Sequence, residues 1–144
     1  MMKVLLCLFL TLFIFNVNAE EESSDVRFVY VDIFAESTET LTAWQLKLTY
    51  AKDIVTIVGI EGSEKNSQKI PYYDTRGMKA GTIILANYDT GKTGIQNGKG
   101  RIARLHLQIR AGQNIKFNIL EKIAATFQGK KLKTKFTIIE GEKK

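Results

Sequence analysis

The chain reads LTAWQLKLTYAKDIVTIVGIE over residues 41–61, and this stretch decides the fold. From Trp44 to Tyr50 every second residue is large and apolar and the residues between them are polar, a period of two that is typical of a strand with one buried face. After a short break at residues 51–53, a second apolar run follows that is rich in β-branched residues, which suit a pleated sheet. The stretch therefore predicts two consecutive strands, with Trp44 in the core.

The rest of the chain repeats this pattern of short apolar runs between turn residues. Residues 102–110 alternate cleanly, which places Ala103 inward and His106 outward, and Pro71 indicates an edge strand because proline cannot donate to a sheet ladder. Further strands are expected at residues 26–35, 70–73, 81–88, 116–127 and 132–139. No segment carries a sustained helical stripe, so roughly seven to nine strands predict an all-β fold, a two-sheet antiparallel β-sandwich.

The first 19 residues are predicted to be a signal peptide outside this fold. A lysine precedes the apolar run at residues 4–15, and a small-x-small pattern ending at Ala19 predicts cleavage before Glu20. The run is shorter than the roughly 20 apolar residues that span a bilayer. Cys7 lies inside the run rather than at its end, which argues against a lipid anchor. We therefore expect a secreted or periplasmic protein without stable membrane insertion.

Residues 20–144 are expected to form a single domain. This part contains no cysteine, and a chain of this length can bury an adequate core without a disulfide. Pro71 is the only proline, and no Gly/Ser-rich linker interrupts the strand pattern. One continuous sandwich is the simplest arrangement of these residues.

Positive charge gathers in the C-terminal third of the chain. Residues 97–144 hold 12 basic and 3 acidic residues, whereas residues 20–96 hold 8 basic and 12 acidic ones. Such a patch fits an acidic polysaccharide or an anionic surface. Lysines on the exposed edge of a terminal strand also discourage aggregation, and this is the interpretation we favour. Nucleic acid is not expected as a partner of an exported protein.

Groups that could carry catalysis or bind a cofactor or metal are few. Residues 86–93 match a relaxed phosphate-loop pattern, but a glycine-rich loop follows where that mechanism needs a helix. His106 is the only histidine, which excludes a two-histidine metal site. Asp74 and Asp89 could pair for glycoside hydrolysis, or bind calcium with Asp53, yet aspartate at such turn positions commonly caps the backbone. We therefore predict no enzyme activity, no cofactor and no metal.

Three tyrosines support an alternative function. Tyr72, Tyr73 and Tyr88 could form an aromatic platform for sugar rings, although tyrosines also anchor ordinary sheet edges with their hydroxyls in water. A carbohydrate-binding module that recognises a polysaccharide is therefore the alternative hypothesis.

The central stretch resembles the cohesin domains, the receptor half of the cohesin–dockerin pairs that assemble extracellular polysaccharide-degrading complexes. In that family an alternating strand ends in Tyr-Asp-Pro and is followed by a hydrophobic strand and a glycine, and WQLKLTYAKDIVTIVGIEG at residues 44–62 resembles this signature. Residues 98–107, GKGRIARLHL, resemble the family's Gly-x-Gly turn and its following strand. The resemblance covers nearly all of residues 20–144 and implies a jelly-roll sandwich of about nine strands.

The resemblance implies a non-catalytic module that binds another protein, such as a dockerin, through one flat sheet face in an extracytoplasmic assembly. That face includes the strand at residues 43–50, and its predicted contacts are Gln45, Lys47, Thr49 and the neighbouring Asn87. The chain departs from the family at two places. Ala51 and Lys52 replace Asp and Pro, and Ala43 and Gln45 stand where dockerin-binding members often carry Asn and Asp.

Overall fold

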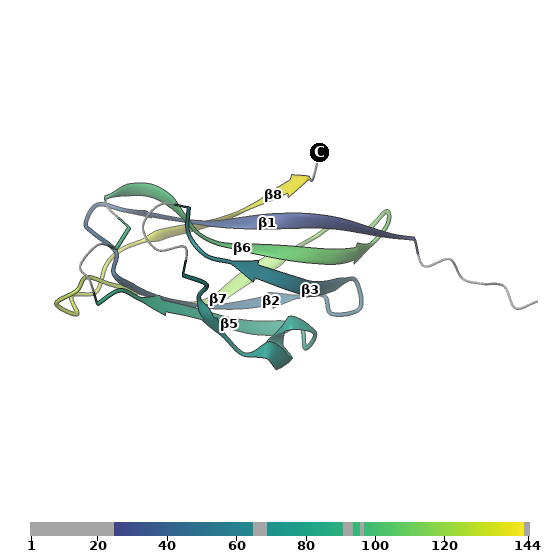
Figure 1. Ribbon diagram of the computed structural model, residues 1–144, viewed down its shortest axis with the longest axis horizontal. Coiled ribbons are helices and arrows are strands. Elements are labelled where there is room, and N and C mark those ends of the chain that lie inside the picture. The colour runs from purple at the N-terminus through teal and green to yellow at the C-terminus, as the bar shows by residue number, and fades with distance from the viewer. Residues whose placement is uncertain (1–24, 65–68, 91–93, 96, 143–144) are drawn as a thin grey trace, which may run out of the picture.

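Two antiparallel sheets packed face to face make up the computed structural model (Figure 1), which describes residues 25–64, 69–90, 94–95 and 97–142. Within these ranges eight strands form two sheets with the orders β3-β6-β1-β8 and β4-β5-β2-β7. The strands are β1 (Val26–Ser37), β2 (Ala43–Tyr50), β3 (Val55–Glu61), β4 (Tyr72–Tyr73), β5 (Thr82–Tyr88), β6 (Gly98–Arg110), β7 (Phe117–Ala125) and β8 (Lys135–Glu142). The predicted signal peptide lies outside the described residues.

The connections carry the chain from one sheet to the other at almost every step. The strands β1, β3, β6 and β8 belong to one sheet, and β2, β4, β5 and β7 belong to the other. This alternation, with every pairing antiparallel, is typical of jelly-roll sandwiches. The predicted all-β sandwich is therefore confirmed.

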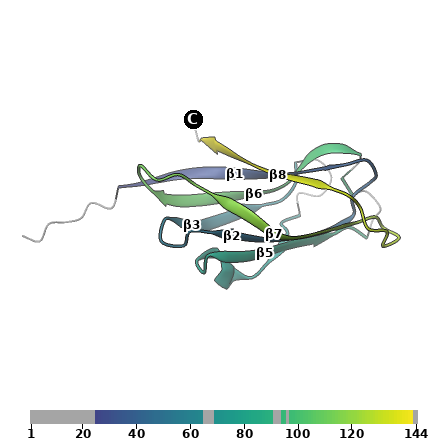
Figure 2. The ribbon, with the colours of Figure 1, turned by 180° about the vertical axis from the view of Figure 1, so that it is seen from behind.

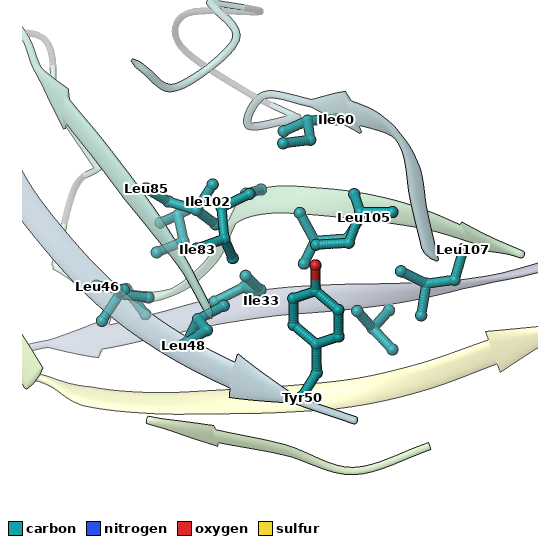
Figure 3. Close-up of a cluster of buried hydrophobic side chains, with 14 of the residues drawn as sticks. Ile33, Leu46, Leu48, Tyr50, Ile60, Ile83, Leu85, Ile102, Leu105 and Leu107 are labelled. Atoms are coloured by element: carbon teal, nitrogen blue, oxygen red, sulfur yellow. The ribbon is translucent and has the colours of Figure 1, made fainter. Parts of the chain in front are cut away.

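The core lies between the two sheets, and β2 contributes to it as its alternation predicted. Trp44, Leu46, Leu48 and Tyr50 are at most 7% exposed. Figure 3 shows Leu46 and Leu48 lying among buried side chains of β5 and β6, which belong to different sheets. The Tyr50 hydroxyl donates a hydrogen bond of 2.6 Å to the carbonyl oxygen of Gly77, which satisfies this polar group inside the core.

Three β-bulges interrupt the strand pairings, and those in β3 and β6 change the expected alternation of core residues. In β3 the register shifts between Ile57 and Gly59, so that Ile60 is buried on the same side as Val55 and Ile57 although it lies an odd number of residues beyond them. In β6 the register shifts opposite Ile33 and Phe34, and Ile102 and Ala103 are both buried. One extra residue on one strand reverses the sides of all residues beyond it, which a strict period of two does not predict.

The ends of the strands also differ from the prediction at the C-terminus. β8 begins at Lys135 rather than at residue 132. Leu132 instead donates a backbone hydrogen bond of 2.8 Å to the carbonyl oxygen of Ala124 in β7. Leu132, Phe136 and Ile138 nevertheless all pack against the core.

Candidate functional site

The outward surface of the β4-β5-β2-β7 sheet, here called the outer sheet face, carries the residues predicted to contact a partner. Gln45 lies between Ala86 of β5 and Ile123 of β7, and directly opposed residues in antiparallel strands point to the same side of the sheet. The alternate residues of β2 are in the core, so this row points outward. Gln45, Lys47 and Thr49 therefore lie together on this face, as the sequence predicted.

Large apolar side chains flank these polar residues. Tyr72, Ile84, Tyr88 and Ile123 are 54%, 42%, 54% and 53% exposed. Beside them, Leu120 at the bulge of β7 is 58% exposed. An exposed apolar surface of this kind marks interaction sites in soluble proteins. The arrangement is a polar central strand with apolar residues on both neighbouring strands.

The outer sheet face also holds an ion pair at its centre. The Lys47 ammonium lies 3.1 Å from a carboxylate oxygen of Glu121, which stands opposite it on β7. Both side chains are partly exposed, and such pairs contribute little to stability, about 0–1 kcal/mol. The pair neutralises two charges on this face and leaves both available for exchange with charges of a partner.

Two of the three tyrosines come together at the edge of this face. The rings of Tyr72 and Tyr88 stack with centroids 5.9 Å apart and planes 10° apart, and the Lys69 ammonium lies 6.0 and 5.8 Å from the two centroids. Tyr73 is not part of this pair. It stands opposite the buried Leu85, so its side chain lies on the other side of the sheet.

Asn87 does not lie on the outer sheet face, contrary to the sequence-based expectation. The register places it opposite Trp44, on the side of the sheet that faces the core. Its side-chain oxygen is buried and has no hydrogen-bond partner among the described residues. A direct role of Asn87 in partner contact is therefore inconsistent with its position.

Ile84 and Ile123 were missed as functional candidates. Ile84 lies inside GTIILANY at residues 81–88, where a strand was expected without a side being assigned to each residue. The structure buries Ile83 and Leu85 and exposes Ile84. Thr82 and Ala86, two residues to either side of Ile84, are polar and small, but the pairing of β5 with β2 is needed to place all three on the outer sheet face.

Ion pairs lie in the middle of the outward surface of the β3-β6-β1-β8 sheet, where Phe28 and Ile139 are 57% and 43% exposed. Asp32 accepts hydrogen bonds of 2.7 and 2.8 Å from Nε and Nη2 of Arg104, and Arg101 lies 3.4 Å from the same carboxylate. The guanidinium of Arg104 lies 3.9 Å from the ring centroid of Tyr30. These groups satisfy one another, unlike the apolar residues of the outer sheet face.

The pKa values of two acids in this network are shifted. Burial alone would raise the pKa of Asp32, but the hydrogen bonds and charges of Arg104 and Arg101 outweigh burial and hold that pKa below its ordinary value. The hydrogen bond from His106, 2.6 Å from the Glu61 carboxylate, is the main reason why the pKa of Glu61 is also lowered. His106 faces outward, as predicted, and contacts Glu61.

The remaining candidates are the turn aspartates and the phosphate-loop pattern. Asp74 caps the short 3₁₀-helix at Thr75–Met78 by accepting a 3.0 Å hydrogen bond from the Arg76 amide, and this confirms the capping interpretation. Among the described residues no group of three His, Cys, Asp or Glu side chains is placed to hold a metal ion. In the same residues no helix is long and apolar enough to span a membrane. Residues 91–93 of the phosphate-loop pattern lie outside the described residues.

Comparison with solved structures defines the class of fold as a cohesin-like β-sandwich. No family model matches the chain, and no curated protein matches its sequence. A non-cellulosomal cohesin from the archaeon Archaeoglobus fulgidus superposes with a TM-score of 0.60 and 14% identity, over 76% of this chain and 75% of the cohesin.

Two cohesins from Clostridium thermocellum, each solved in a type I cohesin–dockerin complex, are similar to the same extent. The OlpC cohesin has a TM-score of 0.61 and 16% identity, over 81% of this chain and 86% of its own. The OlpA cohesin has a TM-score of 0.59 and 12% identity, over 83% and 89%. The fold implied by the sequence resemblance is thus confirmed.

Proposed function

We propose that this protein is a non-catalytic, cohesin-like module that binds another protein through the outer sheet face. The observation that carries the proposal is the set of large apolar side chains exposed on one flat sheet, Tyr72, Ile84, Tyr88 and Ile123. Burial of apolar surface contributes about 25 cal/mol per Å², so covering these side chains favours association. The presence of dockerins in the OlpC and OlpA complexes supports a protein as the partner.

The polar residues of β2 are proposed to set orientation rather than affinity. Gln45 and Thr49 offer hydrogen-bonding groups in the middle of the face, between the apolar residues of β5 and β7. Lys47 can exchange its contact with Glu121 for a carboxylate of the partner. Polar groups in an interface fix its register, while buried apolar anchors supply most of the binding energy.

The partner is proposed to be dockerin-like, and the assembly extracytoplasmic. The cohesin-like fold and the signal-peptide pattern at residues 1–19 support this setting, in a periplasm or outside the cell. Ala43 and Gln45 offer fewer hydrogen-bonding groups than the Asn and Asp found in dockerin-binding relatives. We therefore expect a partner that depends more on apolar contacts with Ile84 and Ile123.

A pull-down with paired variants tests this function. Residues 20–144 are immobilised and incubated with the secreted or periplasmic fraction of the native cells, with and without calcium. Ile123→Glu places a charge on the outer sheet face, and Phe28→Glu places one at a residue that is 57% exposed on the opposite sheet. We expect a protein that is retained by the wild type and by Phe28→Glu but lost with Ile123→Glu.

The comparison of retention with and without calcium identifies the kind of partner. A calcium-dependent protein with duplicated calcium loops would establish a dockerin-like partner. Equal retention by both variants, or loss only with Phe28→Glu, would contradict the proposed face.

Binding to a polysaccharide is the second candidate function. The exposed, parallel pair Tyr72 and Tyr88 favours it, because the apolar faces of sugar rings stack on aromatic side chains. Retention on insoluble polysaccharide should then be lost with Tyr72→Ala and Tyr88→Ala and kept with Tyr73→Ala, since Tyr73 lies on the other side of the sheet. Equal binding by all three variants would exclude this pair as the sugar site.

A further inference from the structure

A second candidate binding site lies where β7 and β8 form the open side of the sandwich. Figure 2 shows both strands in front, each at the edge of its own sheet. Between them is a cleft of about 520 Å³. This cleft, here called the edge cleft, is lined by Lys122, Ala124, Leu132, Lys133, Thr134, Lys135 and Phe136.

The position of Lys122 is unusual for a lysine. It stands opposite Leu46, which is completely buried, so the Lys122 side chain lies on the core side of its sheet and faces the edge cleft. An ammonium group on the core side must reach water or an anion, because burying an unpaired charge is costly. A lysine placed there also discourages pairing with an uncharged strand.

Two more lysines line the same cleft from the β8 side. Among the described residues, Lys122, Lys133 and Lys135 have no ion pair with a carboxylate. Glu36 stands opposite Lys135 on β1 without forming one, and this register places Lys135 on the outward side of its sheet, at the rim of the cleft. Thr134, between the two lysines, is only 8% exposed, and its hydroxyl lacks a hydrogen-bond partner. Three cations and an unsatisfied hydroxyl therefore gather around one cleft.

The backbone beside the cleft is available for pairing. In the part of the chain that the structure describes, β7 has β2 as its one neighbouring strand and β8 has β1. At one end the cleft is closed by the bridge between Ala125 and Lys131 and by the hydrogen bond from Leu132 to Ala124. From this end towards the start of β7, the outer edge of the strand presents N–H and C=O groups with which an added strand can pair.

We propose that the edge cleft binds an extended acidic peptide segment of a partner protein. The peptide backbone pairs with the free edge of β7, and the carboxylates along one side of the peptide meet Lys122, Lys133 and Lys135. The free strand edge favours a peptide over an acidic polysaccharide, because a polysaccharide cannot continue the sheet's hydrogen-bond ladder. This site is independent of the outer sheet face.

A labelled synthetic peptide of alternating Glu and Val residues tests the proposal by fluorescence anisotropy. We expect it to bind, and we expect a peptide with Gln in place of every Glu not to bind. The triple variant Lys122→Gln/Lys133→Gln/Lys135→Gln should weaken binding at least tenfold. The double variant Lys52→Gln/Lys79→Gln, which removes exposed lysines outside the cleft, should change it less than twofold.

Amide hydrogen exchange separates strand addition from general attraction of charge. The acidic peptide should slow exchange at the β7 amides of the wild-type protein. Equal weakening by the triple and double variants, or unchanged exchange in β7, would overturn the proposal. Binding of heparin without binding of the acidic peptide would also overturn it, in favour of an acidic polysaccharide. Urea unfolding, followed by the fluorescence of Trp44, checks that each variant is folded.

Discussion

Replacing Asp32 with Asn tests whether the charge network on the β3-β6-β1-β8 sheet stabilises the fold. The Asp32 carboxylate accepts two hydrogen bonds from Arg104 and lies near Arg101, and its side chain is 14% exposed. In Asp32→Asn one amide oxygen can still accept from Arg104, but the amide NH₂ then faces a second guanidinium donor. The variant therefore removes the charge that Arg104 pairs with, and leaves Arg101 with Glu64, 3.7 Å away, as its ion-pair partner.

The expected loss lies between those for an exposed and a buried ion pair. Exposed pairs contribute about 0–1 kcal/mol, whereas removing one partner of a buried pair costs about 3–5 kcal/mol. The Arg104 side chain is 24% exposed, so partial access to water reduces the cost. We expect Asp32→Asn to lower the free energy of unfolding by about 2–3 kcal/mol at neutral pH.

The pH dependence gives the sign of the effect independently. Because the pKa of Asp32 in the folded protein is below its ordinary value of 3.8, the carboxylate stabilises the fold fully above that value. This contribution is lost as pH falls through the lowered pKa. The difference between wild type and Asp32→Asn should therefore be constant near neutral pH and should shrink below a pH of about 3.8.

Urea unfolding at several pH values measures both effects. Trp44 is the only tryptophan and is 6% exposed, so its fluorescence reports the opening of the core. Asp53→Asn, at an exposed residue, is the matched control and should change stability by less than about 0.5 kcal/mol. If Asp32→Asn matched this control, or if its effect grew as the pH fell below 3.8, the reasoning would be refuted.

Two further pairs of variants test the packing. Leu48→Ala, at a completely buried residue, should lower the free energy of unfolding by about 2–5 kcal/mol, whereas Ile123→Ala on the outer sheet face should lower it by less than about 1 kcal/mol, both measured with urea. Gly141→Ala should cost about 1–3 kcal/mol, because the new methyl group collides with the Tyr30 ring. Gly59→Ala should stay within about 1 kcal/mol, since its methyl group makes only ordinary contacts from 3.5 Å, and equal melting temperatures for the two glycine variants would contradict this contrast.

The sequence predicted the fold where the alternation along a strand is unbroken. In β2 the buried residues are Trp44, Leu46, Leu48 and Tyr50, as the period of two required. A strict period of two fails at Ile60, which is buried because a bulge just before it shifts the register by one residue. A bulge depends on how two strands pair, and no single strand records it.

The candidate site was predicted only in part, for the same reason. Gln45, Lys47 and Thr49 follow from the alternation within β2, but Asn87 and Ile84 needed the register between β2 and β5. The charge network was missed altogether, because Asp32 and Arg104 are 72 residues apart in sequence and become neighbours only when β1 pairs with β6. Contacts between distant strands are set by tertiary pairing, which local patterns do not specify.

Site-specific photo-crosslinking tests the central claim, that the outer sheet face docks a protein partner, most directly. A photoreactive amino acid is introduced at Ile123 on this face and, in a second protein, at Phe28 on the opposite sheet; both positions are more than 50% exposed. The two proteins are irradiated in the native extracytoplasmic fraction. We expect a discrete crosslinked protein from position 123 and none from position 28. The same adduct from position 28 alone, or from both positions in equal yield, would contradict docking through the outer sheet face.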